Sequence, residues 1–157
     1  MKKLTVFIGI WKGVGQGIYP TIEPFDYQKT LRFEPDAEFS LLHYEQQANV
    51  IAPSVSCHWE SGFVRPLEGG FIQISNSQNS GRVEVLQGRL EVDGQITRLD
   101  LSSLLIDNDS RMAETRRIFE VRDDSLQYTV SMATHTTPIP ELQPHLSASL
   151  VRLSPRE

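Results

Sequence analysis

Apolar and polar residues alternate along much of this chain. Between residues 25 and 33, one face of an extended strand carries Phe25, Tyr27, Leu31 and Phe33. Further runs place apolar residues on one face in the same way: Leu99 and Leu101; Phe119 and Val121; and Leu126, Tyr128, Val130 and Met132. A period of two is typical of half-buried strands in an antiparallel sheet, so the chain is predicted to consist mostly of strands.

Turn-forming residues separate these runs at short intervals. The turn signals are Glu34-Pro35-Asp36, Glu68-Gly69-Gly70, Asn79-Ser80-Gly81, Asp93-Gly94 and Asp123-Asp124. The spacing leaves about nine or ten strands, which is typical of an all-β barrel or sandwich. Helices are expected only as two short pieces, one near the amino terminus and one around Asp107 to Ala113. A closed barrel of this size removes sheet edges and has room inside for one small molecule.

The amino-terminal segment is rich in glycine for a predicted strand. One face of it carries, in order, Gly9, Trp11, Gly13, Gly15, Gly17 and Tyr19. Because glycine weakens a strand and packs against nothing, four glycines on one face need a physical reason. Three reasons are open: a sharp bend of the barrel, another backbone lying close, or a bulky ligand beneath the strand.

The composition narrows the function classes. The chain has 157 residues, enough for one domain with a core, and we expect a single domain over residues 1–157. A formal net charge of −5, with no basic cluster beyond Arg116-Arg117, argues against nucleic acid as a partner. Cys57 is the one cysteine, which excludes an internal disulfide and fits a reducing compartment. No run approaches the roughly 18 apolar residues of a membrane span, and residues 1–10 are interpreted as the first structural element rather than as a signal peptide.

The histidines do not occur at the spacing of a metal cluster. They are His43, His58, His135 and His145. A haem iron, however, needs only one protein ligand, because the porphyrin supplies four nitrogens. A single histidine is therefore compatible with a haem site.

Two interpretations of His145 are open. In the first, its face of the last strand points inward, and two small serines above it leave room for a flat ligand. In the second, the opposite face packs into the core and His145 lies on the surface. The two faces are His145, Ser147 and Ser149, and Leu146, Ala148 and Leu150.

His58 shares a strand face with Glu60, whereas Cys57 and Trp59 lie on the opposite face. The two residues form either an exposed pair or part of a cavity wall. Cys57 is interpreted as a small buried hydrophobic residue rather than as a nucleophile.

Three further residues are candidates for ligand contact. Arg117 shares a face with Phe119 and Val121, where an unpaired charge is costly. Either a bound carboxylate, such as that of a fatty acid or a haem propionate, satisfies it, or the side chain reaches water at the barrel rim. Met132 is either core filler or cavity wall. Thr21 is either a plain turn residue or a hydroxyl at the cavity mouth.

Several segments together resemble the nitrobindin family, which are small haem-binding β-barrels related in shape to fatty-acid-binding proteins. The run Gly9-Ile10-Trp11-Lys12-Gly13-Val14-Gly15 is similar to the family's Gly-x-Trp-x-Gly-x-Gly signature, and residues 58–65 resemble its His-x-Glu-x-Gly-Phe-x-Arg segment. The other similar segments are residues 17–27, 131–134 and 145–150, in the same order along the chain.

The resemblance implies an antiparallel, up-and-down barrel of about ten strands, similar to lipocalins, with one haem b per chain near one open end. His145 would be the axial ligand of the iron, and Thr21 would contact the haem. Met132, His58 and Arg117 are further expected contacts. The implied activity is isomerisation of peroxynitrite to nitrate at ferric haem, with reversible binding of nitric oxide. A cytoplasmic monomer or homodimer without membrane association is expected.

Two features depart from the family pattern. Cys57 stands beside His58 where an apolar residue is expected, and three prolines, Pro138, Pro140 and Pro144, precede His145. A function from another class also stays open, a non-enzymatic carrier of a fatty acid or other apolar small molecule. The predicted barrel and a possible inward position of Arg117 suggest this carrier function.

Overall fold

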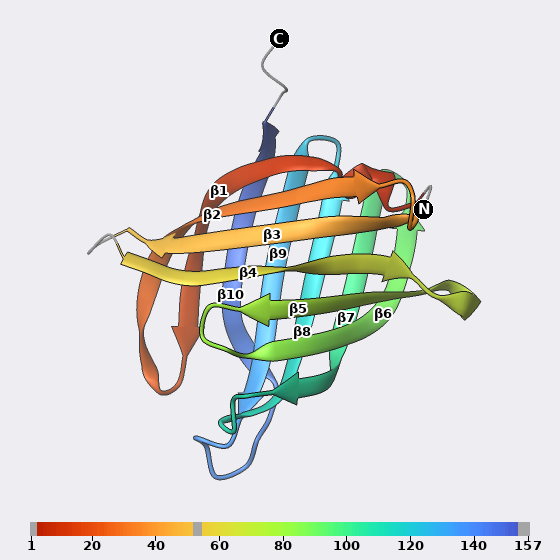
Figure 1. Cartoon of the computed structure of the whole chain (residues 1–157). Coiled ribbons are helices and arrows are strands. Elements are labelled where there is room, and N and C mark those ends of the chain that lie inside the picture. The colour runs from red at the N-terminus through yellow and green to blue at the C-terminus, as the bar shows by residue number, and fades with distance from the viewer. Residues whose placement is uncertain (1–2, 52–54, 154–157) are drawn as a thin grey trace.

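The computed structural model of the chain describes residues 3–51 and 55–153, with side chains for all of these except residues 55–57. Ten strands form one closed antiparallel barrel (Figure 1). Each strand pairs with its neighbours in sequence, and β1 closes the barrel against β10. The strands are β1 (Gly9–Tyr19), β2 (Ile22–Asp36), β3 (Leu41–Val50), β4 (Val55–Pro66), β5 (Phe71–Gln78), β6 (Val83–Asp93), β7 (Ile96–Asp107), β8 (Met112–Arg122), β9 (Ser125–Thr134) and β10 (Gln143–Leu153). The predicted all-β barrel is confirmed.

The described residues contain two short 3-10 helices, η1 (Thr5–Phe7) and η2 (Glu68–Gly70). The first confirms the helical piece expected near the amino terminus, and the second occupies a predicted turn. The helix expected around Asp107 to Ala113 is wrong. A turn lies there instead, with Asn108 in the left-handed region at φ 62°. This turn is closed by a hydrogen bond from the Met112 N–H to the Asp109 carbonyl, so the local polar residues form a turn and not a helix.

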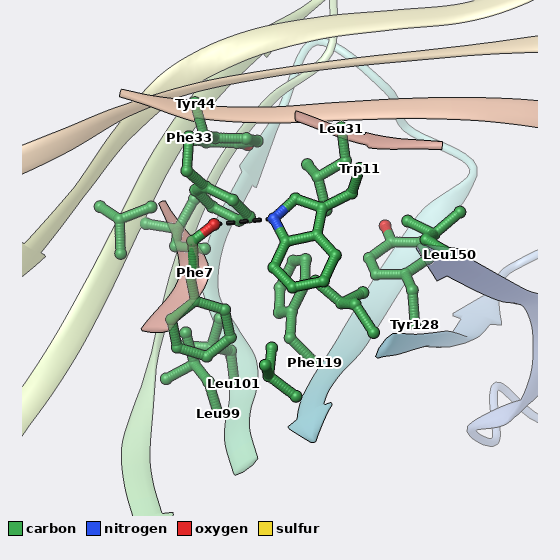
Figure 2. Close-up of a cluster of buried hydrophobic side chains, with 14 of the residues drawn as sticks. Phe7, Trp11, Leu31, Phe33, Tyr44, Leu99, Leu101, Phe119, Tyr128 and Leu150 are labelled. Carbon is green, nitrogen blue, oxygen red and sulfur yellow. Dashed lines mark hydrogen bonds between the residues drawn. The ribbon is translucent and has the colours of Figure 1, made fainter. Parts of the chain in front are cut away.

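One end of the barrel is filled by aromatic and aliphatic side chains. The single turn of η1 places Phe7 within 5.8 Å of the Phe33 ring and 6.4 Å of the Phe119 ring, measured between centroids. Trp11 is fully buried and its indole N–H donates to the Phe7 carbonyl over 2.7 Å (Figure 2). The alternation seen in the sequence therefore directs the apolar faces inward, where they close this end of the barrel.

The glycines of β1 allow β10 and β2 to lie close. A Cβ at Gly13 would stand 1.9 Å from the Ser149 carbonyl oxygen, and one at Gly15 would stand 2.3 Å from the Ser147 carbonyl oxygen. The same Cβ at Gly15 would lie 2.6 Å from the ring of Tyr27. Of the three reasons open from the sequence, the close approach of other chain segments explains these two glycines.

Candidate ligand-binding cavity

A cavity of about 360 Å³ occupies the opposite end of the barrel. Its mouth lies among the β1–β2 turn, the β7–β8 turn and the long β9–β10 loop, which extend from this end in Figure 1. All five residues expected to contact a cofactor line it: Thr21, His58, Arg117, Met132 and His145. Residues that are far apart in sequence are thus brought to one place by barrel closure.

The wall on the β1 side of this cavity is aromatic. The rings of Phe25 and Tyr27 line the cavity, whereas the glycines of β1 do not. The glycine face points inward, as predicted, but Gly15 is backed by Tyr27 and Gly17 by Phe25. A bulky ligand directly beneath the strand, one of the three reasons open from the sequence, is therefore wrong for Gly15 and Gly17, because the two rings fill the space that the missing side chains leave.

A β-bulge directs His145 towards the cavity. The pairing of β10 with β9 shifts register between Pro144 and Leu146, so that His145 has no direct partner. A bulge turns a side chain away from the simple alternation of its strand. Consequently His145 and Leu146 both line the cavity, although they are adjacent in sequence.

Each of the two interpretations of His145 from the sequence is correct for one part of β10. His145 itself lines the cavity, as the first expected, and Ala148 and Leu150 pack into the core, as the second expected. Beyond the bulge, Ala148 and Leu150 are buried, whereas Ser147 and Ser149 are exposed. The prediction that Ser147 and Ser149 leave empty volume inside the barrel is therefore wrong. The surface position of His145 is wrong as well, because the simple alternation of two faces does not hold through the bulge.

One ring nitrogen of His145 is held by the backbone. Its Nδ1 lies 2.9 Å from the Ile18 carbonyl oxygen, which can only accept a hydrogen bond, so Nδ1 carries the hydrogen. Tyr19 packs edge-on against the imidazole at 6.0 Å, and its hydroxyl is 2.9 Å from the Thr134 hydroxyl. Burial lowers the pKa of His145, although the hydrogen bond to Ile18 acts in the other direction. The neutral ring therefore presents a free Nε2 lone pair.

The inner end of the cavity is charged but internally paired. Arg117 is only 4% exposed, and its guanidinium donates to both carboxylate oxygens of Glu60 and to one of Glu84. The expected alternative of a rim position in contact with water is wrong. The other alternative, a bound carboxylate, loses its physical basis because two carboxylates of the chain already balance the charge.

His58 and Glu60 form the pair that the sequence suggested. The Nε2 atom of His58 lies 2.8 Å from Oε2 of Glu60, and both residues line the cavity. Glu60 is buried, and Trp59 on the opposite face is 49% exposed. The cavity-wall interpretation is therefore correct, and the exposed-pair interpretation is wrong. The side chain of Cys57 lies outside the described residues.

Several polar residues of the cavity were missed by sequence reasoning. Lys29 is buried between Tyr27 and Leu31 on the apolar face of β2, with its ammonium group 4.0 Å from the centre of the Tyr128 ring. It also donates to the side-chain oxygen of Gln46. The sequence signal that could have identified Lys29 as a cavity residue is a charged side chain on a strand face that is otherwise apolar. Glu84 gives the same signal, since it lies among apolar residues in β6.

The remaining candidates lie where ligand contact is possible. Thr21 is exposed in the turn before β2, and Met132 is half-buried near the end of β9. Among the described residues, no group of three or more His, Cys, Asp or Glu side chains could hold a metal ion.

A model of the THAP4-like, heme-binding beta-barrel domain matches residues 1–152. The chain belongs to this family. The resemblance recognised from the sequence is thereby confirmed, and it extends over nearly the whole chain. No helix within the described ranges is both long and apolar enough to cross a membrane.

Named relatives of this THAP4-like barrel cover most of its length. An Arabidopsis thaliana protein named peroxynitrite isomerase Rv2717c is 39% identical over 150 residues, which cover 96% of this chain and 87% of the relative. Peroxynitrite isomerase 1 of Mycobacterium tuberculosis is 31% identical over 159 residues, covering 97% and 94%. The crystal structure of Rv2717c from M. tuberculosis superposes with a TM-score of 0.86 at 29% identity, covering 98% of this chain and 96% of that one.

The cavity residues fit the haem that the family name implies. A single neutral imidazole with one nitrogen held by a carbonyl and the other free is the donor set of an axial haem ligand. Apolar side chains of Ile22, Phe25 and Leu146 line the cavity near it and suit a flat hydrophobic macrocycle. A mouth open to solvent suits propionate groups, which carry charge.

Proposed function

We propose that this barrel binds one haem b and isomerises peroxynitrite to nitrate at the ferric iron, and that it binds nitric oxide at the same place. The observation that carries the proposal is the state of His145, whose Nδ1–H is fixed on the Ile18 carbonyl and whose Nε2 is free beside the cavity. The names of the relatives from A. thaliana and M. tuberculosis give the same activity for those proteins.

In this proposal His145 holds the cofactor and sets its orientation. The hydrogen bond to Ile18 and the edge contact with Tyr19 limit rotation of the imidazole. A fixed imidazole loses little freedom when it binds a metal, which favours affinity. When bound, haem would supply a Lewis-acidic iron that can bind a small ligand.

Other cavity residues have supporting roles in the proposal. Phe25 and Leu146 line the cavity and would exclude water from a bound cofactor, and Met132 would add an adaptable apolar contact. Thr21 lies at the mouth, where its hydroxyl would meet the polar edge of the haem. Arg117 would contribute through the charge-balanced inner end rather than by pairing with a propionate.

Titration with hemin tests the role of His145. Wild-type protein is expected to give a Soret band that saturates at one haem per chain, and His145→Ala should weaken binding and shift the band. His135→Ala is the matched control, because His135 is exposed in the β9–β10 loop and does not line the cavity. An identical Soret spectrum and affinity for His145→Ala and wild type would overturn the assignment.

Peroxynitrite decay tests the activity separately. Stopped-flow mixing of peroxynitrite with the ferric protein should give faster decay than buffer, with nitrate as the product. Decay no faster than with the same concentration of His145→Ala would contradict the isomerase proposal while leaving haem binding intact.

The alternative of a fatty-acid carrier has less support from the cavity. The carrier function was suggested by an inward arginine that would need a bound carboxylate. Arg117 is instead paired with Glu60 and Glu84. Extraction followed by mass spectrometry distinguishes the two functions, since a carrier should yield a stoichiometric lipid and a haem protein should not.

The oligomeric state and cellular location expected from the sequence are part of the same proposal. It holds that residues 1–157 form one domain and that the protein is a cytoplasmic monomer or homodimer without nucleic-acid or membrane partners. The single cysteine supports a reducing compartment, and the net charge of −5 disfavours nucleic acid. Light scattering after gel filtration measures the oligomeric state.

A further inference from the structure

The cavity contains two histidines, and each has one ring nitrogen held in place. His145 is held through Nδ1 by the backbone, and His58 is held through Nε2 by Glu60 at 2.8 Å. Within the described residues, the nitrogens without a hydrogen-bond partner are Nε2 of His145 and Nδ1 of His58. The proposed function uses the first and leaves the second without a role.

The hydrogen on His58 can be placed from its partner. Burial alone would raise the pKa of Glu60, but the Arg117 guanidinium and then His58 hold that pKa well below its usual range. The Tyr44 hydroxyl also donates to Oε1 of Glu60 over 2.8 Å. Glu60 is therefore an ionised carboxylate that only accepts hydrogen bonds, so Nε2 of His58 carries the hydrogen.

It follows that neutral His58 presents a lone pair at Nδ1. No side chain or backbone group in the described part of the chain hydrogen-bonds this atom. The imidazole is 30% exposed and lines the cavity, so a small molecule in the cavity has access to it. A buried carboxylate that holds one ring nitrogen fixes the orientation and tautomer of an imidazole, so that the other nitrogen is presented to a ligand as an acceptor.

We propose that His58 is a proton-exchanging contact for small weak acids that enter the cavity, with Glu60 as its positioning residue. The acid transfers its proton to Nδ1, which breaks the bond between that proton and the acid and forms an N–H bond. The resulting anion stays in the cavity and accepts a hydrogen bond from the imidazolium. The ligand class is thus a small acid that is protonated near neutral pH. This inference rests on the proposed function in that the anion is taken to bind at the haem.

The charges around the cavity are compatible with one added proton. The charged and titratable groups that line this region from other elements are Tyr19, Tyr27, Lys29, Arg82, Glu84, Arg111, Arg117, Tyr128 and His145. Arg117 pairs with both Glu60 and Glu84, and Arg82 lies 3.5 Å from Glu84 and 3.0 Å from Asp109. Burial raises the pKa of Tyr128 to about 12, so this phenol stays neutral. Within the described residues, the Nδ1 atom of His58 therefore remains an acceptor that none of these charged side chains uses.

Cyanide binding to the ferric, haem-loaded protein tests this directly. Hydrogen cyanide is protonated at neutral pH and binds ferric haem as the anion, so each binding event frees one proton. Calorimetry in buffers of different ionisation enthalpy counts the protons that reach the solvent. The wild type should release close to none, because His58 takes the proton, whereas His58→Gln should release about one and bind cyanide more weakly.

His43→Gln is the matched control. His43 lies on the outer side of β3, where its Nε2 is 2.9 Å from the Ser61 hydroxyl, and it does not line the cavity. This variant should keep the wild-type proton count. Release of one proton by the wild type, or equal counts for the wild type and His58→Gln, would overturn the inference.

A measurement without haem separates this inference from the proposed function. Nitrogen-15 NMR of the haem-free protein should show His58 with hydrogen on Nε2 and none on Nδ1. Glu60→Gln should redistribute the two tautomers, and a wild-type ring protonated on Nδ1 would contradict the assignment. Failure of the wild type to bind haem would contradict the proposed function and the haem-bound anion, whereas the nitrogen-15 spectrum of the haem-free protein tests the proton position on His58 independently.

Discussion

The two ends of the barrel are stabilised by different physical effects. At the closed end, Phe7, Trp11 and Phe119 pack against each other with one buried hydrogen bond. At the open end, Glu60 and Arg117 are buried almost completely and are stable only as partners. Apolar packing tolerates many substitutions of similar volume, whereas a buried charge cluster fails when one member is removed. The barrel therefore concentrates apolar packing at one end and buried ionisable side chains at the other.

The largest loss of folding stability is expected for a substitution at the closed end. Trp11→Ala should lower the free energy of unfolding by about 4 kcal/mol, because it leaves a cavity that neighbouring rings cannot fill. Urea denaturation followed by far-UV circular dichroism measures it. Trp11→Phe keeps most of the apolar volume and should cost clearly less. Equal losses for both variants would show that the hydrogen bond to Phe7, and not packing, holds this end.

A somewhat smaller loss is expected at the open end. Arg117→Met should cost about 3 kcal/mol at pH 7, because it leaves buried carboxylates without their cation. Denaturation midpoints at several pH values measure the effect.

The pH dependence of this loss has a definite sign. The pKa of Glu60 is depressed in the folded wild type, so its stabilisation is present above the pKa of the unfolded chain and is lost as pH falls through the folded pKa. In Arg117→Met, burial without the cation favours the protonated carboxyl. The difference between wild type and variant should therefore narrow as pH falls towards 4. A difference that is constant with pH would contradict the charge explanation.

A third variant probes the seam between the first and last strands, which joins both ends. Gly13→Ala should cost about 2 kcal/mol, because the new methyl group would stand 1.9 Å from the Ser149 carbonyl oxygen and force the strands apart. Gly94→Ala is the comparison, since its Cβ would meet nothing within 4 Å and only its φ of 58° opposes the change. Thermal unfolding of both variants should place Gly13→Ala lower.

The smallest loss of folding stability is expected for a substitution at the cavity mouth. Tyr19→Phe removes the hydroxyl that lies 2.9 Å from the Thr134 hydroxyl and should cost about 1 kcal/mol. Thr134 keeps its hydrogen bond with Thr136, which limits the loss. The edge contact of the ring with His145 should persist, so haem affinity should change little. A large loss of haem affinity would show that the hydroxyl, rather than the ring, orients His145.

The strands were predictable because alternation is a local signal. The face carrying Phe25, Tyr27, Leu31 and Phe33 was assigned correctly, and four of the five turn signals lie at breaks between strands. Glu34-Pro35-Asp36 was an exception, because β2 runs on to Asp36. The β7–β8 turn was mistaken for a helix because short polar segments carry little periodicity.

The site was predictable in its residues but not in its geometry. The segments around Thr21, His58, Met132 and His145 pointed to one cavity through their resemblance to a family. The bulge at His145 could not be inferred, since an extra residue in a strand depends on the register with its neighbour. The ion pairs of Arg117 were equally hidden, because Glu60 and Glu84 meet it only after the barrel closes.

The hydrogen bond between His145 and Ile18 joins positions 127 residues apart in the chain. During translation, at about 5–20 residues per second, β1 is made roughly 6–25 s before β10. In that interval neither strand alone can hold the imidazole in its orientation. Under the proposed function, haem uptake through His145 is a late event that requires the complete barrel, and retained haem would serve as a marker that the last strand has docked.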